Sequence, residues 1–442
     1  MTFVVAAGGV LGGILVASAV GFSLSRLFAA DLTRAELASW SLSTGLLVQS
    51  LLLAICVSIA PGCGPAPVLA LDLLVVATAL LVAPIPPPSP RARGGQGEGA
   101  ILLLLAIAAA AWLVFLFSAI AEPMWSTDFL AIWGLKGKTI ATTGHVPRRL
   151  FDDPTLYWAH REYPLLVPLS LAMMASFAGG WNDQALALLF PVCELATLFV
   201  LFGFLARRVS PLAGAAACAL TALCFPLYRA VNAGTAEVPF AFSLVLVCCA
   251  FLDVLDRSLP SVRARLFAAS LFCVSIKQEG TLFVGLLALA LLVRRRREAW
   301  MLIAPPVLHW GALYLLRGPQ TRRDFKFTFF QPRHWAELVP RFFHVLGRIL
   351  GTEAIVGWLP LVAILVYLLV TRRGIADSLL TVFPLQILCY AIAFSVSSFD
   401  PIWAVGAFRR IALTLFPALT LALCARLPAG KPAASGAATA QP

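Results

Sequence analysis

The chain has 442 residues, of which 60% are hydrophobic and 12% are charged. A water-soluble protein is expected to carry about 25% charged residues, so this composition excludes a soluble globular protein, a disordered chain and a nucleic-acid-binding module. The formal net charge is +12, and we expect much of it in cytoplasmic loops, where lysine and arginine collect in membrane proteins. The sequence therefore predicts an all-α, polytopic integral membrane protein.

Fourteen apolar runs approach the length of a membrane-spanning helix, which needs about 20 residues. They lie at 3–23, 40–60, 66–86, 100–121, 164–179, 184–205, 211–227, 236–254, 264–277, 280–293, 299–316, 354–371, 377–397 and 409–426. The arginine clusters at 207–208, 294–297 and 372–373 fall on one side of the membrane only if the run at 164–179 does not cross. We therefore expect 13 transmembrane helices, an outside amino terminus, an inside carboxyl terminus, and an interfacial or re-entrant helix at 164–179.

These runs predict six parts of the chain. They are N-terminal transmembrane helices (1–121), a first outer loop with interfacial helices that we expect to be catalytic (122–183), central transmembrane helices (184–316), a second outer loop (317–353), C-terminal transmembrane helices (354–427) and a flexible cytoplasmic tail (428–442). Both outer loops interleave aromatic and charged residues, which suits short helices in the headgroup plane. Glycine pairs near the amino terminus are expected to pack helices, because neither a preceding strand nor a following GK[ST] motif accompanies them.

Ionisable residues at the outer ends of the predicted helices indicate a functional site. A charged side chain at membrane depth costs about 2.5 kcal/mol or more, so it is expected to be paired or functional. Asp128 and Lys136 lie in the first outer loop, and Glu237 opens a central helix. The remaining members lie in later turns and helix ends predicted to face the same side: Lys277, Glu279, Asp400, Arg409 and Arg410.

Acids and bases on one outer face suit the transfer of a group from a lipid phosphate. Lysine or arginine can neutralise the phosphate and stabilise it as it departs, while a carboxylate can take the proton of an acceptor hydroxyl. Structural alternatives stay open. Asp128 could be an ordinary loop acid, Lys277 and Glu279 could pair across a tight turn, Arg409 and Arg410 could be interface anchors, and Glu237 could simply favour a helix amino end.

The sequence contains no motif that indicates a metal site. The ten cysteines lie almost entirely in apolar runs and are expected to be buried thiols. The five histidines, at 145, 160, 309, 334 and 344, show no metal-binding spacing and are expected to be interface or loop residues. We therefore expect no cofactor, and a divalent metal is not supported.

The order of the outer motifs resembles the GT-C class of polytopic glycosyltransferases that use polyprenyl-phosphate sugars, such as bacterial aminoarabinose transferases and protein mannosyltransferases. The matching segments are DFLAIWGLKGKTIATTGHVP, REYPLLVPLSLAMMASFAGGWNDQALALLFPV, LFGFLARRVS, NAGTAEVPFAFSLVL, SIKQEG and RRIALTLFP. They cover residues 122–300 and, more loosely, 400–420. The first hundred residues fall outside the comparison, because four predicted helices precede the first outer loop where many members of the class have one.

The resemblance implies roles for individual residues. It implies that Asp128 is the catalytic acid, which acts as general base on the acceptor or orients it. Lys136 and Tyr163 resemble contacts to the donor phosphate or sugar, and Arg410 resembles the late arginine that binds the lipid phosphate. The other implied residues line the outer cavity, and they are Glu237, Lys277, Glu279 and Arg409. Lys277 is also a candidate phosphate ligand. A single acid stands where many relatives carry an adjacent acidic pair, which weakens the case for Asp128 as the sole base.

We therefore expect a hexosyl- or pentosyltransferase of the inner (plasma) membrane, active on the periplasmic or extracytoplasmic side. It would transfer a sugar from a polyprenyl-phosphate donor to a lipid, polysaccharide or protein acceptor by inverting displacement, with membrane lipids and no nucleic acid as further partners. Two alternatives stay open. One is a transporter or flippase of lipid-linked sugars, although the inverted repeats and broken helices typical of transporters are not found in the sequence. The other is an enzyme like an O-antigen polymerase or ligase.

Overall fold

The computed structural model describes residues 2–59 except 30, 66–82, 98–146, 159–317 except 161, 335–351, 378–396 and 400–427, with a few positions between 355 and 367. All regular structure in these residues is helical, which confirms the predicted all-α class. Three predicted features lie mostly or wholly outside the described residues: the first part of the second outer loop, the run at 354–371 and the tail at 428–442.

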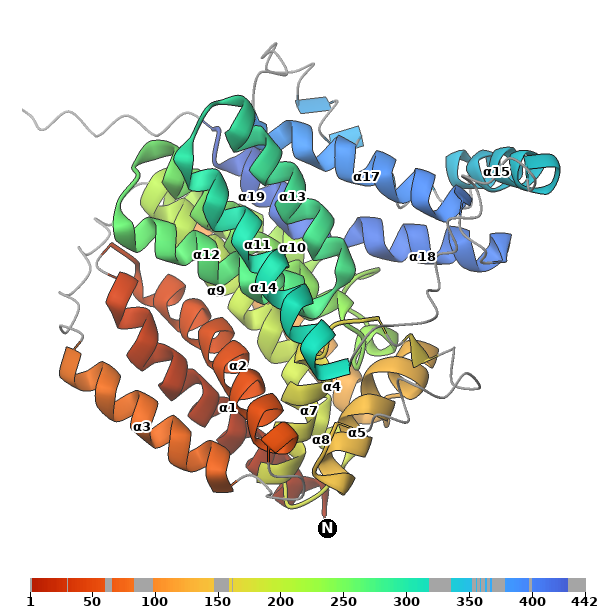
Figure 1. The fold of residues 1–442 in the computed structure, drawn as a ribbon. Helices are drawn as coiled ribbons and strands as arrows, with labels where there is room; N and C mark the ends of the chain where they lie inside the picture. The colour runs from red at the N-terminus through yellow and green to blue at the C-terminus, as the bar shows by residue number, and fades with distance from the viewer. Residues whose placement is uncertain are drawn as a thin grey trace, which may run out of the picture.

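Most of the helices pack side by side in one bundle, while three carboxyl-terminal helices extend to one side of it (Figure 1). The amino-terminal helices are α1 (Phe3–Ser25), α2 (Arg34–Ile59), α3 (Ala66–Val82) and α4 (Glu98–Ala121). The central helices are α5 (Gly134–Thr143), α7 (Leu166–Phe177), α8 (Asp183–Leu186), α9 (Leu189–Arg208), α10 (Pro211–Ala222), α11 (Glu237–Asp256), α12 (Pro260–Ile276), α13 (Gln278–Val293) and α14 (Trp300–Arg317). The carboxyl-terminal helices are α15 (Trp335–Leu350), α17 (Ser378–Val396), α18 (Pro401–Leu413) and α19 (Phe416–Cys424).

Seven helical stretches within the described residues are long and apolar enough to cross a membrane. They are Phe3–Phe28, Arg34–Ile59, Glu98–Ala121, Asp183–Arg208, Glu237–Asp256, Leu379–Val396 and Pro401–Cys424. Four shorter apolar helices accompany them: Ala66–Ala79, Leu166–Phe177, Pro211–Ala222 and Gln278–Val293. These helices indicate a membrane-embedded protein, while the number of 13 crossings stays a prediction.

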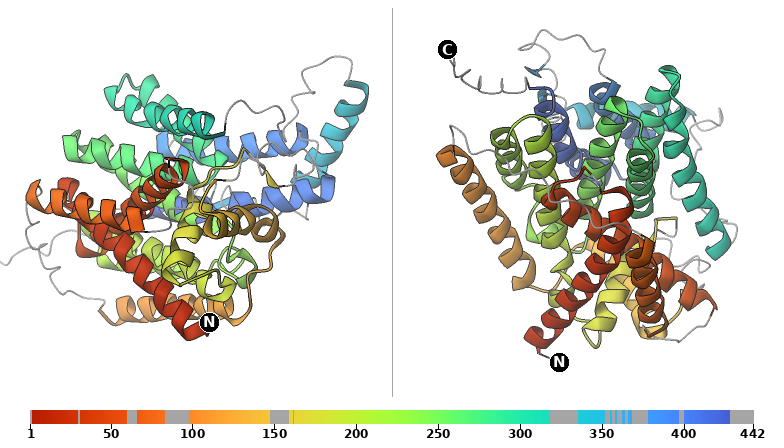
Figure 2. Two further views of the ribbon diagram at one scale, coloured as in Figure 1. Left: turned by 60° about the horizontal axis from the view of Figure 1, so that its bottom comes forward. Right: turned by 90° about the vertical axis from the view of Figure 1, so that its left-hand side faces the viewer.

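The outward-facing surface of α4 is apolar, as expected for a helix that contacts lipid. Figure 2 shows this helix at the edge of the bundle, where it packs on α10 and α9. Its outer face leaves large apolar side chains exposed, namely Leu102, Leu103, Leu113, Val114 and Phe117. A contiguous apolar face of this kind is unstable in water and stable against lipid tails.

Two predicted crossings differ from the helices that form. The run at 211–227 contains α10, which ends at Ala222 because Pro226 cannot continue a helix. The last crossing was placed at 409–426, but α18 already begins at Pro401, after Asp400 accepts a hydrogen bond from the Ile402 amide at 2.8 Å. Arg410 therefore lies near the end of α18, about 15 Å from Asp400 along the helix axis and six residues before the last helix, α19, begins.

The run predicted not to cross the membrane forms α7. Its 12 residues span about 18 Å, which is too short for a crossing, and ten of them are buried. A Cβ at Gly9 would lie 2.5 Å from the Phe177 carbonyl oxygen, and one at Gly13 would lie 2.7 Å from the Met174 sulfur. The second glycine of each pair in α1 therefore lets α7 approach closely, as the sequence predicted. Because α7 is buried in protein, it fits a re-entrant helix better than an interfacial one.

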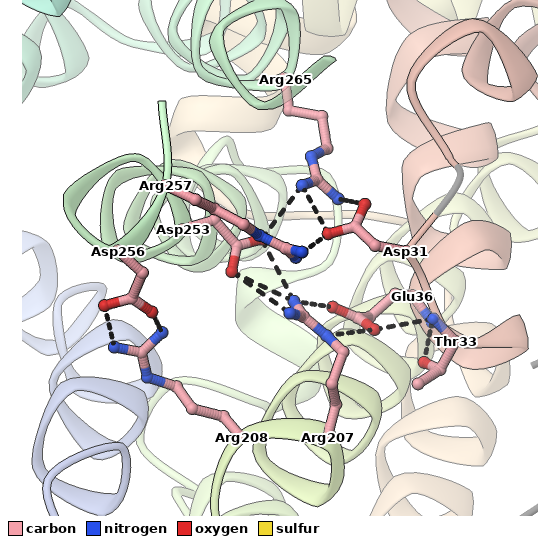
Figure 3. A network of polar contacts seen from close by, with 9 residues as sticks. All are labelled: Asp31, Thr33, Glu36, Arg207, Arg208, Asp253, Asp256, Arg257 and Arg265. Atoms are coloured by element: carbon pink, nitrogen blue, oxygen red, sulfur yellow. Dashed lines mark hydrogen bonds and ion pairs between the residues drawn. The ribbon is translucent and has the colours of Figure 1, made fainter. Parts of the chain in front are cut away.

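An arginine network joins four helices at one end of the bundle (Figure 3). Arg207, at the end of α9, pairs with Glu36 of α2 at 2.9 Å and with Asp253 of α11 at 3.1 Å. Arg265 of α12 pairs with Asp253 at 3.3 Å and with Asp31 at 3.0 Å. Arg257 also pairs with Asp31, and Arg208 forms a separate pair with Asp256 beside the network. Buried charges need such partners, and the arginines that indicated a cytoplasmic side are here matched by carboxylates.

Helices α1 and α2 cross in backbone contact. A Cβ at Gly21 would lie 1.7 Å from the Ser41 carbonyl oxygen, and one at Gly45 would lie 1.8 Å from the Ala17 carbonyl oxygen. Both clashes involve backbone atoms, which cannot rotate away as a side chain can. The crossing therefore depends on the absence of side chains at these two positions.

We expect Gly21→Ala to lower the melting temperature of the purified protein in detergent, because the two helices must separate to admit the methyl group. Gly12→Ala is the matched control on the same helix, since a Cβ at Gly12 meets nothing within 4 Å. Alanine favours a helix by about 1 kcal/mol over glycine, so this control should be neutral or stabilising. Equal melting temperatures for the two variants would contradict the close crossing.

Candidate active site

Five ionisable side chains from separate parts of the chain meet in one ion-pair cluster. Arg410 donates from Nη2 to Asp128 Oδ2 at 2.5 Å, and its Nε lies 3.0 Å from Glu237 Oε1. The Lys277 ammonium lies 3.0 Å from Glu237 Oε1 and 3.5 Å from Glu279 Oε1. The expected convergence of Asp128, Lys277 and Arg410 is thus found, and Glu237 is the residue that both cations share.

The ion-pair cluster and the arginine network lie at opposite ends of the same helices. Glu237 is the first residue of α11, while Asp253 of the network lies about 24 Å further along it. Likewise α12 carries Arg265 near its start and is followed directly by Lys277. Between these ends, residues 238–252 of α11 are buried and, apart from Ser243, apolar. This spacing approaches the roughly 30 Å of a bilayer's hydrocarbon core, as expected for two faces of a membrane protein.

The segment before Glu237 forms a tightly bonded turn. The amide of the buried Asn232 donates to the carbonyl oxygens of Pro226 at 3.1 Å and Leu227 at 2.6 Å. The Thr235 hydroxyl donates to the Asn232 carbonyl oxygen at 2.8 Å. These bonds satisfy buried polar groups that would otherwise destabilise the fold, and they fix the place at which α11 and its first residue, Glu237, begin.

Gly234 brings this turn against the segment that carries Asp128. Its φ of +86° lies in the left-handed region, which favours glycine. A Cβ at this position would lie 2.7 Å from the Phe129 ring and 2.8 Å from the Met124 sulfur. The close approach of the two segments therefore places Asp128 and Glu237 on either side of Arg410.

Asp128 precedes an unusual helical turn. The Ser126 hydroxyl accepts a hydrogen bond from the Phe129 amide at 3.2 Å, after which Phe129–Trp133 form the π-helical turn η2 and continue into α5. Single π-helical turns are rare and occur frequently at functional sites. The Asp128 side chain is 24% exposed, whereas Glu237 is fully buried, so Asp128 is the more accessible carboxylate on Arg410.

Lys136 and Tyr163 form a second group, the aromatic stack, beside the cluster. The buried Lys136 ammonium donates to the His160 carbonyl oxygen at 2.6 Å and lies 6.0 Å from the centre of the Tyr163 ring. That ring stacks on Trp133 at 5.4 Å and on His160 at 4.8 Å between centroids. Trp133 is the last residue of the turn η2, which follows Asp128 directly, so the chain connects the aromatic stack to the ion-pair cluster.

Not every predicted site residue joins these groups. Arg409 is exposed on α18 and has no ion pair with the cluster among the described residues, in contrast to its neighbour Arg410. Glu279 contacts Lys277 and lies 15% exposed at the edge of the cluster. The sequence could not separate Arg409 from Arg410, because adjacent residues on a helix point about 100° apart and only packing determines which one faces inward.

Some residues of the site were missed from the sequence. His160 was expected only at a loop or interface, yet it lies in the aromatic stack with a φ of +46°, which is uncommon for a residue other than glycine. Its position three residues before Tyr163 was the available signal. Gln386 of α17 donates to the Glu279 carbonyl oxygen at 3.2 Å, and a buried amide inside a predicted crossing could have indicated it. The packing role of Gly234 has no local signal.

The described residues offer no metal centre. No group of three or more His, Cys, Asp or Glu side chains in them is arranged to hold a metal ion. The carboxylates of the cluster face arginine and lysine instead. The carboxylates of the cluster are therefore matched by cations of the chain itself.

Comparisons of the chain with family models, with curated proteins and with solved structures found no match. The resemblance to GT-C glycosyltransferases therefore stays a prediction. A function can be proposed from the geometry of the ion-pair cluster and the aromatic stack.

We expect Glu237→Gln to destabilise the protein by about 3 kcal/mol, because it leaves the buried Lys277 ammonium with only the more distant Glu279. The double variant Glu237→Leu/Lys277→Met removes both charges and should recover most of this loss. Thermal unfolding in detergent measures both effects, with the exposed Glu122→Gln as control. Wild-type stability in Glu237→Gln would show that the pair is not needed by the fold.

Proposed function

We propose that the chain is a membrane glycosyltransferase that moves one sugar from a polyprenyl-phosphate carrier to the hydroxyl group of an acceptor. The acceptor is a lipid, a polysaccharide or a protein. The observation that carries the proposal is the direct contact between Asp128 and Arg410, which lie 282 positions apart in the chain. A partly exposed carboxylate beside a guanidinium supplies the base and the phosphate ligand that this reaction requires.

The cations of the cluster take the phosphate in this proposal. The planar fork of a guanidinium matches a phosphate with two parallel hydrogen bonds, and its charge persists at any physiological pH. Arg410 is therefore the principal ligand. Lys277, which shares Glu237 with Arg410, adds positive charge on the same side. The buried Lys277 acts strongly on an anion because little water screens it, and the Arg410 side chain is 34% exposed, so an anion can reach it.

The aromatic stack supports a place for the sugar. Tyr163 is only partly buried and is held between two further rings, so its orientation is fixed. Because its faces are stacked on these rings, Tyr163 offers a sugar its ring edge and its hydroxyl group. Lys136 supports this arrangement by holding the His160 carbonyl oxygen and is itself a candidate contact to donor oxygens.

In the proposed reaction the acceptor oxygen attacks the anomeric carbon from the face opposite the phosphate, which inverts the configuration. The proton of the acceptor hydroxyl passes to the Asp128 carboxylate while the oxygen electron pair forms the new bond to carbon. The bond between the anomeric carbon and the phosphate oxygen breaks, and its electron pair leaves with the phosphate. Arg410 neutralises the added charge on the departing polyprenyl phosphate, and Asp128 then releases its proton to water.

The proposal includes a topology. Thirteen crossings would place the ion-pair cluster on the extracytoplasmic side of the plasma membrane and the arginine network on the cytoplasmic side. The separation of the two groups along α11 and α12 supports this assignment. The donor would then enter from the outer leaflet, with its phosphate directed at Arg410 and Lys277.

We expect Asp128→Asn to reduce transfer at least about 100-fold, the lower end of the usual contribution of a general base, while the protein still elutes as a folded species. The assay supplies purified protein with radiolabelled polyprenyl-phosphate sugars and crude acceptor fractions, and it measures free polyprenyl phosphate and glycosylated acceptor. Glu122→Gln removes an exposed acid of the same loop and should retain activity. Full activity in Asp128→Asn would refute the assigned base, and movement of label across vesicles without product would indicate a transporter.

The neighbouring arginines provide a second test with an internal control. Arg410→Gln should reduce transfer by about 100-fold or more, because a preorganised donor to the developing anion is lost. Arg409→Gln removes the same charge from an exposed position one residue away and should change the rate less than about twofold. Equal losses in both variants would indicate that surface charge, and not a phosphate contact, is what the reaction needs.

A further inference from the structure

The ion-pair cluster contains more negative than positive charge. The carboxylates of Asp128, Glu237 and Glu279 face only two cations, Lys277 and Arg410. A phosphate carries further negative charge, and like charges brought together in a poorly hydrated place repel strongly. An anion therefore cannot simply be added to the cluster as it stands. One of the carboxylates must leave its cation when a phosphate binds.

The contacts of Arg410 identify which carboxylate leaves. Its Nη2 donates to Asp128 and its Nε faces Glu237. A guanidinium binds a phosphate with two parallel hydrogen bonds through one of two edges, Nε with Nη2 or Nη1 with Nη2. Nη2 carries two N–H groups and belongs to both edges, so a phosphate bound through either edge meets the Asp128 carboxylate at that nitrogen, where the two anions repel each other.

Glu237 is held far more firmly than Asp128. Glu237 is fully buried, opens the rigid helix α11 and contacts Lys277 as well as Arg410. Asp128 is partly exposed, and Arg410 is its one ion-pair partner among the described residues. A phosphate therefore replaces Asp128 on Arg410 at a lower cost in free energy than it would replace Glu237, because the Asp128 carboxylate can turn toward water. Glu237 stays in place and keeps the guanidinium oriented.

From this geometry we propose that Asp128 and the donor phosphate exchange at Arg410, so that binding of the phosphate releases Asp128 to act as base. The inference rests on the proposed function and adds a regulatory step to it. Before the donor binds, the base is held in an ion pair that both blocks the phosphate ligand and keeps the carboxylate from an acceptor. The carboxylate becomes available only when the phosphate is already in position.

The exchange predicts that loss of the carboxylate strengthens phosphate binding even though it abolishes transfer. We expect Asp128→Asn to bind polyprenyl phosphate about tenfold or more tightly than the wild type, because no competing charge-assisted hydrogen bond must be broken. Titration of the purified proteins in lipid nanodiscs with polyprenyl phosphate measures both dissociation constants. Asp128→Ser, which removes the same charge with a smaller side chain, serves as a second variant should the first fail to fold.

Matched controls separate exchange from general electrostatics. Glu122→Gln makes the same change in net charge at an exposed site and should leave the dissociation constant within about twofold. Polyprenol, which lacks the phosphate, should bind wild type and Asp128→Asn alike, and inorganic phosphate should show the same preference for Asp128→Asn if the phosphate alone drives the exchange. If Asp128→Asn binds only polyprenyl phosphate, and not inorganic phosphate, more tightly than the wild type does, the prenyl chain contributes to recognition. That result would still support the exchange.

The binding and transfer assays together distinguish failure of the exchange from failure of the proposed transferase activity. A wild type that transfers sugar, together with an Asp128→Asn variant that binds polyprenyl phosphate equally or more weakly, would overturn the exchange and leave the transferase intact. A wild type without transfer activity whose Asp128→Asn variant binds the phosphate more tightly would keep the exchange and reject the reaction. Polyprenyl phosphate that binds none of the proteins would overturn both.

Discussion

The fully buried carboxylate of Glu237 holds the candidate site together. It receives Lys277 and Arg410, each at 3.0 Å, and thereby joins the start of α11, the turn between α12 and α13, and the end of α18. Removing one partner from such a pair leaves an uncompensated charge in a poorly hydrated interior, so the three elements are constrained as a unit. The position of Arg410, and through it the position of Asp128, follows from this constraint.

A second constraint acts at the far ends of the same helices. The arginine network binds α2, α9, α11 and α12 to one another, so α11 is fixed at both ends and is apolar between them. A membrane protein can place charges only at its two polar boundaries or in a protein-lined interior. The two ionic groups therefore mark the two ends of the bundle, about 24 Å apart along α11.

Much of this arrangement was accessible from the sequence because hydrophobic runs and charge patterns are local signals. The apolar runs predicted the helices, and the placement of Asp128, Lys277 and Arg410 on one face predicted that they meet. The apolar run after Arg410 predicts a later helix start than the one that forms, because α18 begins at the capped pair Asp400 and Pro401. The packing role of Gly234 could not be predicted, since it arises from contacts with Phe129 and Met124, which lie far away in the chain.

The account depends on Arg410 being the ligand of a lipid phosphate. An electron cryomicroscopy structure of the protein in nanodiscs with bound polyprenyl phosphate tests this most directly. We predict that the phosphate lies within hydrogen-bond distance of the Arg410 guanidinium, that Glu237 keeps its contacts, and that the Asp128 carboxylate has turned away. A phosphate bound elsewhere, with the pair between Arg410 and Asp128 intact, would contradict the account.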